Sequence, residues 1–302
     1  MHRRLLLYLT ALGTVFLWGA SFPLTKAALA WSGPTAIAFL RWAISSFVLA
    51  IWLARKGRLW PAGALLRAHG GRVLWVGFCG ITLFYTLENL ALRYTTAINA
   101  GVLANLTTVF MLLLGVLWLG ERLRRVEWAA GCAALIGAVL VSQGAGHLTM
   151  ARAGLAGDLL MAAATLFAAI YSVGSKRLLA SHPADVVMTV VAMAGTAMLL
   201  PFALWEGLSL ALPLPIWGVL LLLGVGSGAL ANLWWMQILA YTTASRAGMA
   251  LLLIPLVSTT LAVLFLGERL SPIILAGGAL VVAGVLVVQR HGEEVPQHDR
   301  NA

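Results

Sequence analysis

The chain contains few charged residues for its length. Of its 302 residues, 10% are Asp, Glu, Lys or Arg and 61% are hydrophobic, whereas soluble domains contain roughly 25% charged residues. This composition excludes an ordinary water-soluble globule. Apolar stretches of about 20 residues recur along the whole chain, and each is long enough to cross a bilayer of about 30 Å as a helix. The sequence therefore predicts an all-α polytopic membrane protein.

Residues that serve metal, redox and nucleotide chemistry are also scarce. The two cysteines, Cys79 and Cys132, lie in apolar segments, which argues against a disulfide framework or a metal site. No G-x-x-x-x-G-K-[ST] sequence occurs, so ATP is not expected to drive the protein directly. All six histidines fall in loops or tails, whereas an intramembrane enzyme needs His, Asp or Glu clustered within its spans. We expect no cofactor, no metal and no enzymatic activity, and a membrane-embedded enzyme is the less favoured alternative.

The formal net charge of +10 reflects membrane orientation rather than a nucleic-acid partner. The basic residues sit in short connections between apolar stretches, not on one soluble face. With the N-terminus in the cytoplasm, the 20 Lys and Arg residues divide into fifteen inside, three outside and two within spans. This positive-inside bias predicts a multi-pass protein of the cell inner (plasma) membrane with both termini cytoplasmic.

Charges, glycine and proline divide the chain into ten expected spans. The first apolar stretch is too long for a signal peptide and many equal spans follow it, so we interpret it as a retained span. The spans cover residues 5–28, 34–53, 73–92, 97–118, 126–143, 155–175, 185–205, 214–239, 247–266 and 272–289.

The sequence also repeats itself. "RYTTAINAGVLANLTTVFMLLLGVLWLGERL" at 93–123 aligns without a gap on "AYTTASRAGMALLLIPLVSTTLAVLFLGERL" at 240–270, an offset of 268 − 121 = 147 residues. We expect two copies of a five-span unit, residues 1–147 and residues 148–302, the second with a short cytoplasmic tail. Because five is odd, the second copy is inverted in the membrane. Transporters built this way bind substrate near the midplane, between the halves, and alternate access by rocking.

Several motifs resemble the EamA-type family of the drug/metabolite transporter (DMT) superfamily. They are "FLWGASFPLTKAAL" at 16–29, "FLRW" at 39–42, "GDLL" at 157–160, "LLLIP" at 251–255 and both copies of "LGERL". The resemblance covers nearly the whole chain. It implies ten helices in two inverted halves around a central cavity, usually exporting small metabolites such as amino acids. Thr108 stands where the family often has the proline that Pro255 supplies in the second half.

Ionisable residues inside spans are functional candidates by default. Glu88 is the one acidic residue well within a span, and Lys26 and Arg41 lie at comparable depth on the first and second spans. A pair between Glu88 and either cation would avoid the cost of an isolated buried charge. Two interpretations stay open. One is a fixed ion pair or a snorkelling group; in the other, Glu88 binds a substrate amine or a proton, while Arg41 or Lys26 meets a carboxylate.

Polar and aromatic side chains deep in the spans complete the candidate site. On the first span, polar residues recur every three or four positions and form one helical stripe. Packing and helix–helix hydrogen bonding are the structural alternatives for each residue. Together with Glu88, the expected substrate-binding residues are Trp18, Ser21, Tyr85, Asn105, Tyr171, Asn232 and Trp235.

Two prolines are candidate hinges. Pro23 and Pro255 interrupt backbone hydrogen bonding within the first and ninth spans. A static kink is the alternative interpretation of each.

Both copies of "LGERL" are typical of helix ends. Gly120 and Gly267 suit the position that follows a helix. Glu121 and Glu268 are expected to interact with the N-terminus of the helix that follows each of them, where partial positive charge accumulates. This interpretation places the substrate site elsewhere, in the cavity between the halves.

These observations favour a secondary transporter for small metabolites such as amino acids, with aromatic or branched ones first, and export is the expected direction. Transport would be proton-coupled or facilitative, and the protein a monomer or a homodimer in the lipid bilayer. A passive channel or a lipid-handling membrane protein is the alternative, because an inverted repeat alone does not demonstrate alternating access.

Overall fold

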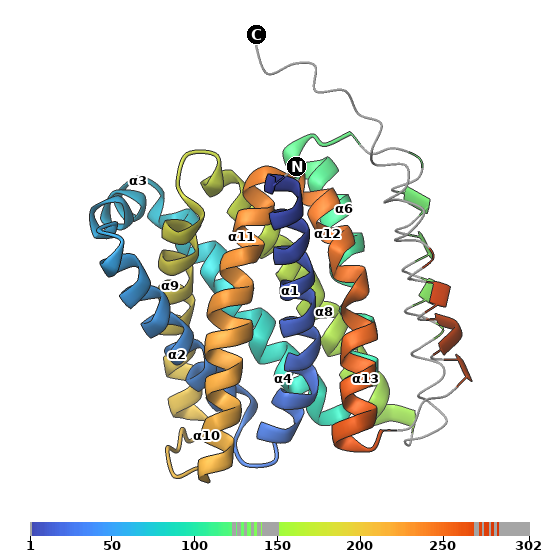
Figure 1. The fold of residues 1–302 in the computed structure, drawn as a ribbon. Coiled ribbons are helices and arrows are strands. Elements are labelled where there is room, and N and C mark those ends of the chain that lie inside the picture. The colour runs from blue at the N-terminus through green and yellow to red at the C-terminus, as the bar shows by residue number, and fades with distance from the viewer. Residues whose placement is uncertain are drawn as a thin grey trace.

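The computed structural model describes residues 2–122 and 151–268 without a break, and single positions between 125 and 140 and between 272 and 283. All regular secondary structure in this part of the chain is helical, and most helices run along one common direction in a bundle (Figure 1). The first stretch contains α1 (His2–Ala28), α2 (Pro34–Arg55), α3 (Leu59–Gly77), η1 (Phe78–Leu83), α4 (Phe84–Tyr94), α5 (Ala97–Leu103) and α6 (Leu106–Leu119). The second contains α8 (Ala151–Leu179), α9 (Ala184–Trp205), α10 (Leu214–Leu221), η2 (Leu222–Leu230), α11 (Ala231–Tyr241), α12 (Ala244–Ala250), η3 (Leu251–Leu253) and α13 (Ile254–Leu266).

Seven helical segments of the described residues are long and apolar enough to cross a membrane. They coincide with seven of the predicted spans, and α1 occupies the first, which agrees with a multi-span helical membrane protein. The predicted spans 126–143 and 272–289 lie largely outside the described residues. The ten-helix inverted repeat and its division into residues 1–147 and 148–302 therefore stay predictions.

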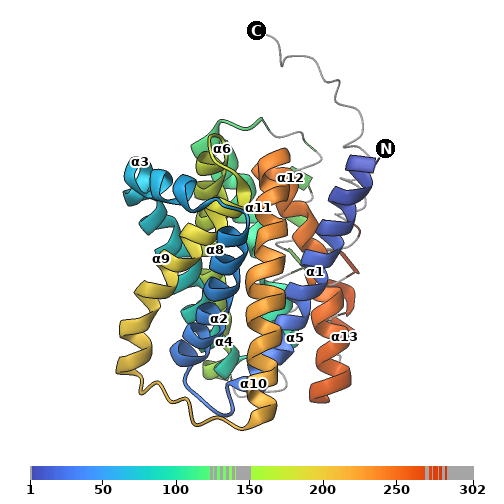
Figure 2. The same ribbon diagram turned by 60° about the vertical axis from the view of Figure 1, so that its left-hand side comes forward.

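The third span begins earlier than predicted. One helical segment runs from Leu59 to Tyr94, whereas the predicted span covered 73–92. Arg67 and Arg72 suggested a loop, but both side chains are exposed, where a helix tolerates charge. A kink at His69 (φ −135°, ψ 26°) divides α3. Figures 1 and 2 show α3 near the end of the bundle at which the N-terminus lies.

Four spans depart from regular α-helix in their interiors. The third and eighth contain the π-helical segments η1 and η2. The fourth breaks between α5 and α6, and the ninth passes from α12 through the 3₁₀ segment η3 into α13. Such irregularities are frequent at functional sites, and inside a membrane they persist where protein rather than lipid surrounds them.

Segments from the two described stretches pack against each other throughout. Helix α1 lies between α11 and α13, as Figure 1 shows, and α8 packs against α4 and α6. Helix α6 also contacts α12, and α13 contacts α5. The bundle therefore has no boundary between an N-terminal and a C-terminal globule, and a site at its centre receives side chains from both stretches.

Glycine permits the closest of these approaches, between α3 and α9. A Cβ added to Gly77 would lie 2.9 Å from the Val191 carbonyl oxygen, and one added to Gly195 would lie 2.6 Å from the Gly77 oxygen. Because lipid gives little hydrophobic drive for helix association, close backbone contact of this kind holds membrane helices together.

Candidate functional site

A cavity of about 60 Å³ lies at the centre of the bundle. Its walls come from α1, α2, η1, α4, α6, α8, α11, η3 and α13 and from Ala104 between α5 and α6, and they are mostly apolar. Seven of the eight predicted substrate-binding residues line it: Trp18, Ser21, Tyr85, Glu88, Tyr171, Asn232 and Trp235. Asn105, the eighth, is fully buried near the break between α5 and α6 and does not line the cavity.

Aromatic rings form much of the cavity wall, and the indole N–H groups of its two tryptophans donate hydrogen bonds within the protein. Trp18 and Trp235 lie with ring centroids 5.4 Å apart. The Trp18 indole N–H donates to the Ser227 carbonyl oxygen (3.1 Å), and that of Trp235 donates to the Ser172 hydroxyl (3.2 Å). What these rings offer a ligand is therefore apolar surface.

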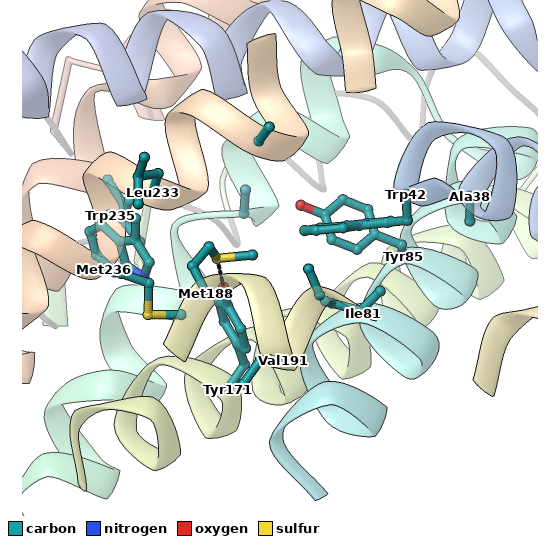
Figure 3. Packing of buried hydrophobic residues seen from close by; sticks show 14 of the residues in the cluster. Ala38, Trp42, Ile81, Tyr85, Tyr171, Met188, Val191, Leu233, Trp235 and Met236 are labelled. Carbon is teal, nitrogen blue, oxygen red and sulfur yellow. Dashed lines mark hydrogen bonds between the residues drawn. The ribbon is translucent and has the colours of Figure 1, made fainter. Parts of the chain in front are cut away.

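Tyr171 closes another part of the wall. Its hydroxyl contacts the Met188 sulfur (3.3 Å; Figure 3) and donates to the Asn232 side-chain oxygen (3.2 Å). The ring lies against Gly80 of η1, where an added Cβ would come within 2.2 Å of it. The π-helical segment η1 thus brings backbone up to Tyr171 at a position where only glycine fits.

Two opposite charges lie in this apolar cavity with incomplete partners. Glu88 and Arg41 are 2% and 1% exposed. The Arg41 guanidinium donates from Nη2 to the Ser227 hydroxyl (2.9 Å) and lies 4.5 Å from the centre of the Tyr85 ring. Its Nε and Nη1 atoms and the Glu88 Oε1 atom have no hydrogen-bond partner among the described residues. Ionised side chains are expensive to bury with incomplete hydrogen bonding, which makes Arg41 and Glu88 the candidate binding groups of this cavity.

Trp42 packs against Tyr85, the ring that contacts Arg41. Its ring meets the Tyr85 ring edge-on with centroids 5.1 Å apart, as Figure 3 shows, and it is fully buried. The Tyr85 ring therefore contacts both the Trp42 ring and the Arg41 guanidinium, and these two contacts fix it at the cavity wall.

Lys26 lies away from the cavity. Its ammonium donates to the Thr95 carbonyl oxygen (2.6 Å) and lies 3.5 Å from Glu268 Oε1. Lys26 forms no ion pair with Glu88, because it reaches from the last turn of α1 towards the end of the bundle. Arg41 interacts electrostatically with Glu88, but the described residues show no direct ion-pair contact between the two side chains.

The two "LGERL" glutamates bind the starts of helices distant in sequence. Glu268 accepts from the backbone N–H groups of Ala97 (2.9 Å) and Ile98 (3.0 Å) at the start of α5. Glu121 accepts from those of Ala244 (2.7 Å) and Ser245 (3.0 Å) at the start of α12. The first turns of the helices that follow in the chain lie largely outside the described residues, so the expected interaction with them stays a prediction.

Antiparallel packing explains why each glutamate bonds to a helix that is distant in sequence. Helices α6 and α13 each end in a glycine of left-handed conformation, Gly120 (φ 67°) and Gly267 (φ 65°), as the sequence predicts. The glutamate after each glycine meets the start of the helix packed antiparallel to the one that has ended. Each carboxylate thus complements the positive helix terminus of a partner distant in sequence.

These contacts define two clusters at opposite ends of the bundle. The Glu268 cluster comprises Lys26, Thr95, Glu268 and the start of α5. The Glu121 cluster comprises Lys176, Thr242, Glu121 and the start of α12. In the second, the Lys176 ammonium donates to the carbonyl oxygens of Leu239 (2.8 Å) and Thr242 and interacts electrostatically with Glu121.

The two candidate hinges differ in their surroundings. Pro23 lies inside α1, which continues as helix to Ala28, whereas Pro255 stands in the first turn of α13 directly after η3. The fourth span breaks as well, although residue 108 is threonine, whose hydroxyl donates to the Gly248 carbonyl oxygen of α12 (2.8 Å). Motion at either proline stays a prediction.

Sequence reasoning missed the residues that organise the wall without being unusual in composition. Ser227 contacts both Trp18 and Arg41, and Trp42 supports Tyr85. Thr107, Thr165 and other cavity residues carry no charge and follow no spacing that separates them from packing residues. The "GVGSG" stretch at 224–228 was the one available signal, since closely spaced glycines in a span mark close backbone contact.

The fold and site together define a multi-span membrane protein with a binding cavity between its helices. Comparison with known proteins gives the family. The chain belongs to the EamA-like transporter family, whose sequence profile matches residues 5–143 and 155–290. The prediction of this family is confirmed, and its named members are transporters rather than enzymes.

Individual relatives match over nearly their whole lengths. An uncharacterized transporter of Archaeoglobus fulgidus is 29% identical and covers 92% of this chain and 96% of its own. A probable terminal-alkyne amino-acid exporter of Streptantibioticus cattleyicolor is 29% identical over 92% of this chain and 91% of its own. A probable amino-acid metabolite efflux pump of Salmonella typhimurium is 25% identical over 92% of both chains. One crystal structure, 23% identical, has a TM-score of 0.74 over 95% of this chain and 98% of that one, a likeness of fold alone.

Proposed function

We propose that this transporter exports small zwitterionic metabolites, with aromatic or branched amino acids first among them, by alternating access. The observation that carries the proposal is that Arg41 and Glu88 line one largely apolar cavity, each with polar atoms that have no hydrogen-bond partner among the described residues. An amino acid has an ammonium, a carboxylate and a side chain close together, and the cavity has a counterpart for each. Two relatives named for amino-acid export support the same substrate class.

The structure favours one of the two cations considered for the carboxylate. Lys26 contacts Thr95 and Glu268 outside the cavity, whereas Arg41 lines the cavity with Nε and Nη1 atoms that have no hydrogen-bond partner in the described part of the chain. Arginine also suits planar anions better than lysine does. Under the proposal Arg41 meets the substrate carboxylate, Glu88 meets the ammonium or a proton, and Trp18 and Trp235 pack against the side chain.

Alternating access requires that the two ends open in turn. With the Glu268 and Glu121 clusters both formed, the cavity of about 60 Å³ is well below the roughly 300 Å³ of typical small-molecule sites. We assign this conformation to a state closed at both ends. Breaking one cluster would separate α5 from α13, or α12 from α6, and admit substrate from that side. The distribution of basic residues supports an orientation with both termini and the Glu121 cluster on the cytoplasmic side of the plasma membrane.

Counterflow in proteoliposomes tests this proposal. Vesicles preloaded with unlabelled L-phenylalanine or L-leucine are expected to accumulate the labelled amino acid transiently, and vesicles preloaded with adenine or succinate are not. Measuring at two pH values separates proton-coupled from facilitative transport. Uptake without stimulation by internal substrate would indicate a passive channel and overturn alternating access. Failure of every amino acid, against transport of another solute, would overturn the substrate class.

A further inference from the structure

Ser227 stands where three cavity side chains meet. It lies in η2, is 2% exposed and is not itself among the residues that line the cavity. Its carbonyl oxygen accepts from the Trp18 indole (3.1 Å) and from the Asn232 side-chain amide (2.9 Å). Its hydroxyl oxygen accepts from Arg41 Nη2 (2.9 Å). Ser227 thus accepts hydrogen bonds from an indole, a side-chain amide and a guanidinium.

The Ser227 carbonyl belongs to a π-helical segment. A regular α-helix uses each interior carbonyl for the N–H four residues later, and a π segment disturbs that ladder. In η2 the Ser227 oxygen serves side chains from two elements, α1 and α11. Asn232 in turn accepts from the Tyr171 hydroxyl (3.2 Å), so the arrangement extends to a fourth cavity residue.

The Ser227 hydroxyl acts as a hydrogen-bond acceptor towards Arg41. It donates its single proton to the Leu223 carbonyl oxygen (2.9 Å), so its lone pairs are left to accept from Arg41. Arg41 has no other hydrogen-bond acceptor among the described residues, and Tyr85 contacts the face of the guanidinium. Ser227 and Tyr85 therefore determine where the unpartnered Nε and Nη1 atoms lie.

Close packing of η2 against α2 places Ser227 next to Arg41. Gly224 and Gly228 of η2 lie against α2, and a Cβ added to Gly228 would be 2.0 Å from the Ser45 hydroxyl. Ser45 donates to the Gly224 carbonyl oxygen (2.8 Å). The two glycine contacts bring the backbone that carries Ser227 against the helix that carries Arg41, and they do not depend on the Ser45 hydrogen bond.

We propose that Ser227 is the positioning residue of a carboxylate subsite, and that it aims Arg41 at the anionic end of the substrate. This rests on the proposed function, in which Arg41 contacts the carboxylate. Trp18 and Asn232 bind the backbone oxygen of Ser227, so a change of its side chain removes the Arg41 contact and leaves theirs. Ser227 therefore affects recognition of the carboxylate and not of the remainder of the ligand.

The test compares two probes that differ in one group. Equilibrium binding of L-phenylalanine and of 2-phenylethylamine, which lacks the carboxylate, is measured on purified full-length protein. Ser227→Ala is expected to weaken L-phenylalanine binding by about tenfold, as for loss of one hydrogen bond to a charged group, and 2-phenylethylamine binding by less than about twofold. Ser227→Cys, with a weaker acceptor, is expected to fall between. Equal weakening of both probes would overturn the proposal.

Ser45→Ala is the matched control, because Ser45 lies in the same α2–η2 contact but bonds only to backbone oxygens. It is expected to leave the ratio of the two affinities unchanged, whatever it does to stability. A change in that ratio equal to that of Ser227→Ala would assign the effect to packing and overturn the positioning role.

A second measurement does not depend on the substrate. In protein labelled with ¹⁵N-arginine, Arg41 signals are identified by their loss in Arg41→Lys. Rotation and proton exchange of the Arg41 Nη2 group are expected to be slow in wild type and in Ser45→Ala and fast in Ser227→Ala. Unchanged rotation would overturn the inference even if amino acids are transported. The expected change, with no amino acid bound, would instead overturn the proposed function alone.

Discussion

The Glu268 and Glu121 clusters contain the same types of residue but differ in the contacts that these residues make. Each has a glutamate on the start of an antiparallel helix and a lysine on a backbone carbonyl. At one end Lys26 also lies 3.5 Å from its glutamate. At the other, Glu121 gains a third hydrogen bond, from the Ser245 hydroxyl (2.5 Å), whereas the equivalent position 147 residues earlier is Ile98.

A further difference concerns Thr95 and Thr242, which the sequence repeat makes equivalent. The Thr95 hydroxyl donates to Asp158 of α8 (2.9 Å), whereas the Thr242 hydroxyl donates to backbone oxygens of its own segment. The Glu268 end thus adds an ion pair to its hydrogen bonds, and the Glu121 end adds a third hydrogen bond to its glutamate. We therefore expect the two ends to respond differently to salt and to substitution.

The largest effect is expected at the cavity that both clusters enclose. Glu88→Gln keeps the shape of the side chain but removes its charge, so proton- or gradient-driven uptake of L-phenylalanine into proteoliposomes should fall to background while the protein stays folded. Glu206→Gln is the matched control, because Glu206 binds the start of α2 far from the cavity. Unchanged coupling in Glu88→Gln would contradict the prediction.

The next effect distinguishes the two ends directly. In a protein with Thr107→Cys as cavity reporter and Cys79 and Cys132 replaced by alanine, Glu121→Ala should speed labelling by an impermeant thiol reagent from the cytoplasmic side. Glu268→Ala should speed it from the outside. An increase of about 10–100-fold is expected, since hydrogen bonds to charged groups contribute about 1.5–3 kcal/mol. Labelling of both variants from the same side would refute the assignment of the clusters to opposite gates.

A smaller effect separates ion pairing from hydrogen bonding. The Lys26–Glu268 pair is partly exposed, so salt should weaken it and accelerate outside labelling by about threefold, within the range of exposed ion pairs. Lys26→Gln should remove this salt dependence. Lys176→Gln, the matched change at the other end, should leave it intact. Equal salt dependence in both variants would show that the pair does not distinguish the ends.

The smallest effect is expected from Ser245→Ala, which makes the Glu121 end resemble the Glu268 end. The Glu121 carboxylate keeps its two backbone N–H donors and loses the hydroxyl. Cytoplasmic labelling of the Thr107→Cys reporter should rise about twofold, as for one hydrogen bond of about 0.5 kcal/mol, because two donors remain. Thr260→Ala is the control, since that hydroxyl bonds within its own exposed helix turn. An equal change in the control would attribute the effect to general loosening.

Much of the site could be predicted because membranes restrict what a polar residue can do. Glu88 and Asn232 are candidates because lipid does not tolerate such polar groups, and Trp18 because it lies on the polar stripe of the first span; all three line the cavity. The glycines that end α6 and α13 were likewise predictable, because a helix end with a left-handed residue has a strong local signature.

The remaining features depend on contacts between distant segments. Whether Lys26 faces Glu88 or Glu268 is decided by the packing of α1 against α13, and spacing along one helix does not contain that information. The partners of Glu121 and Glu268 follow from antiparallel contact in the same way. The π segment that exposes the Ser227 oxygen has no composition that distinguishes it from ordinary apolar helix.

The exchange of carboxylates between antiparallel helices has a consequence for biogenesis. Glu121 and Glu268 bind amides at opposite ends of the bundle. If one half of the chain entered the bilayer in the wrong orientation, both carboxylates would lie at the same end, and the helix starts they bind would lie at the other. Two unpaired carboxylates and two uncapped helices would then remain, so we expect the two clusters to favour the correct relative orientation of the halves during insertion.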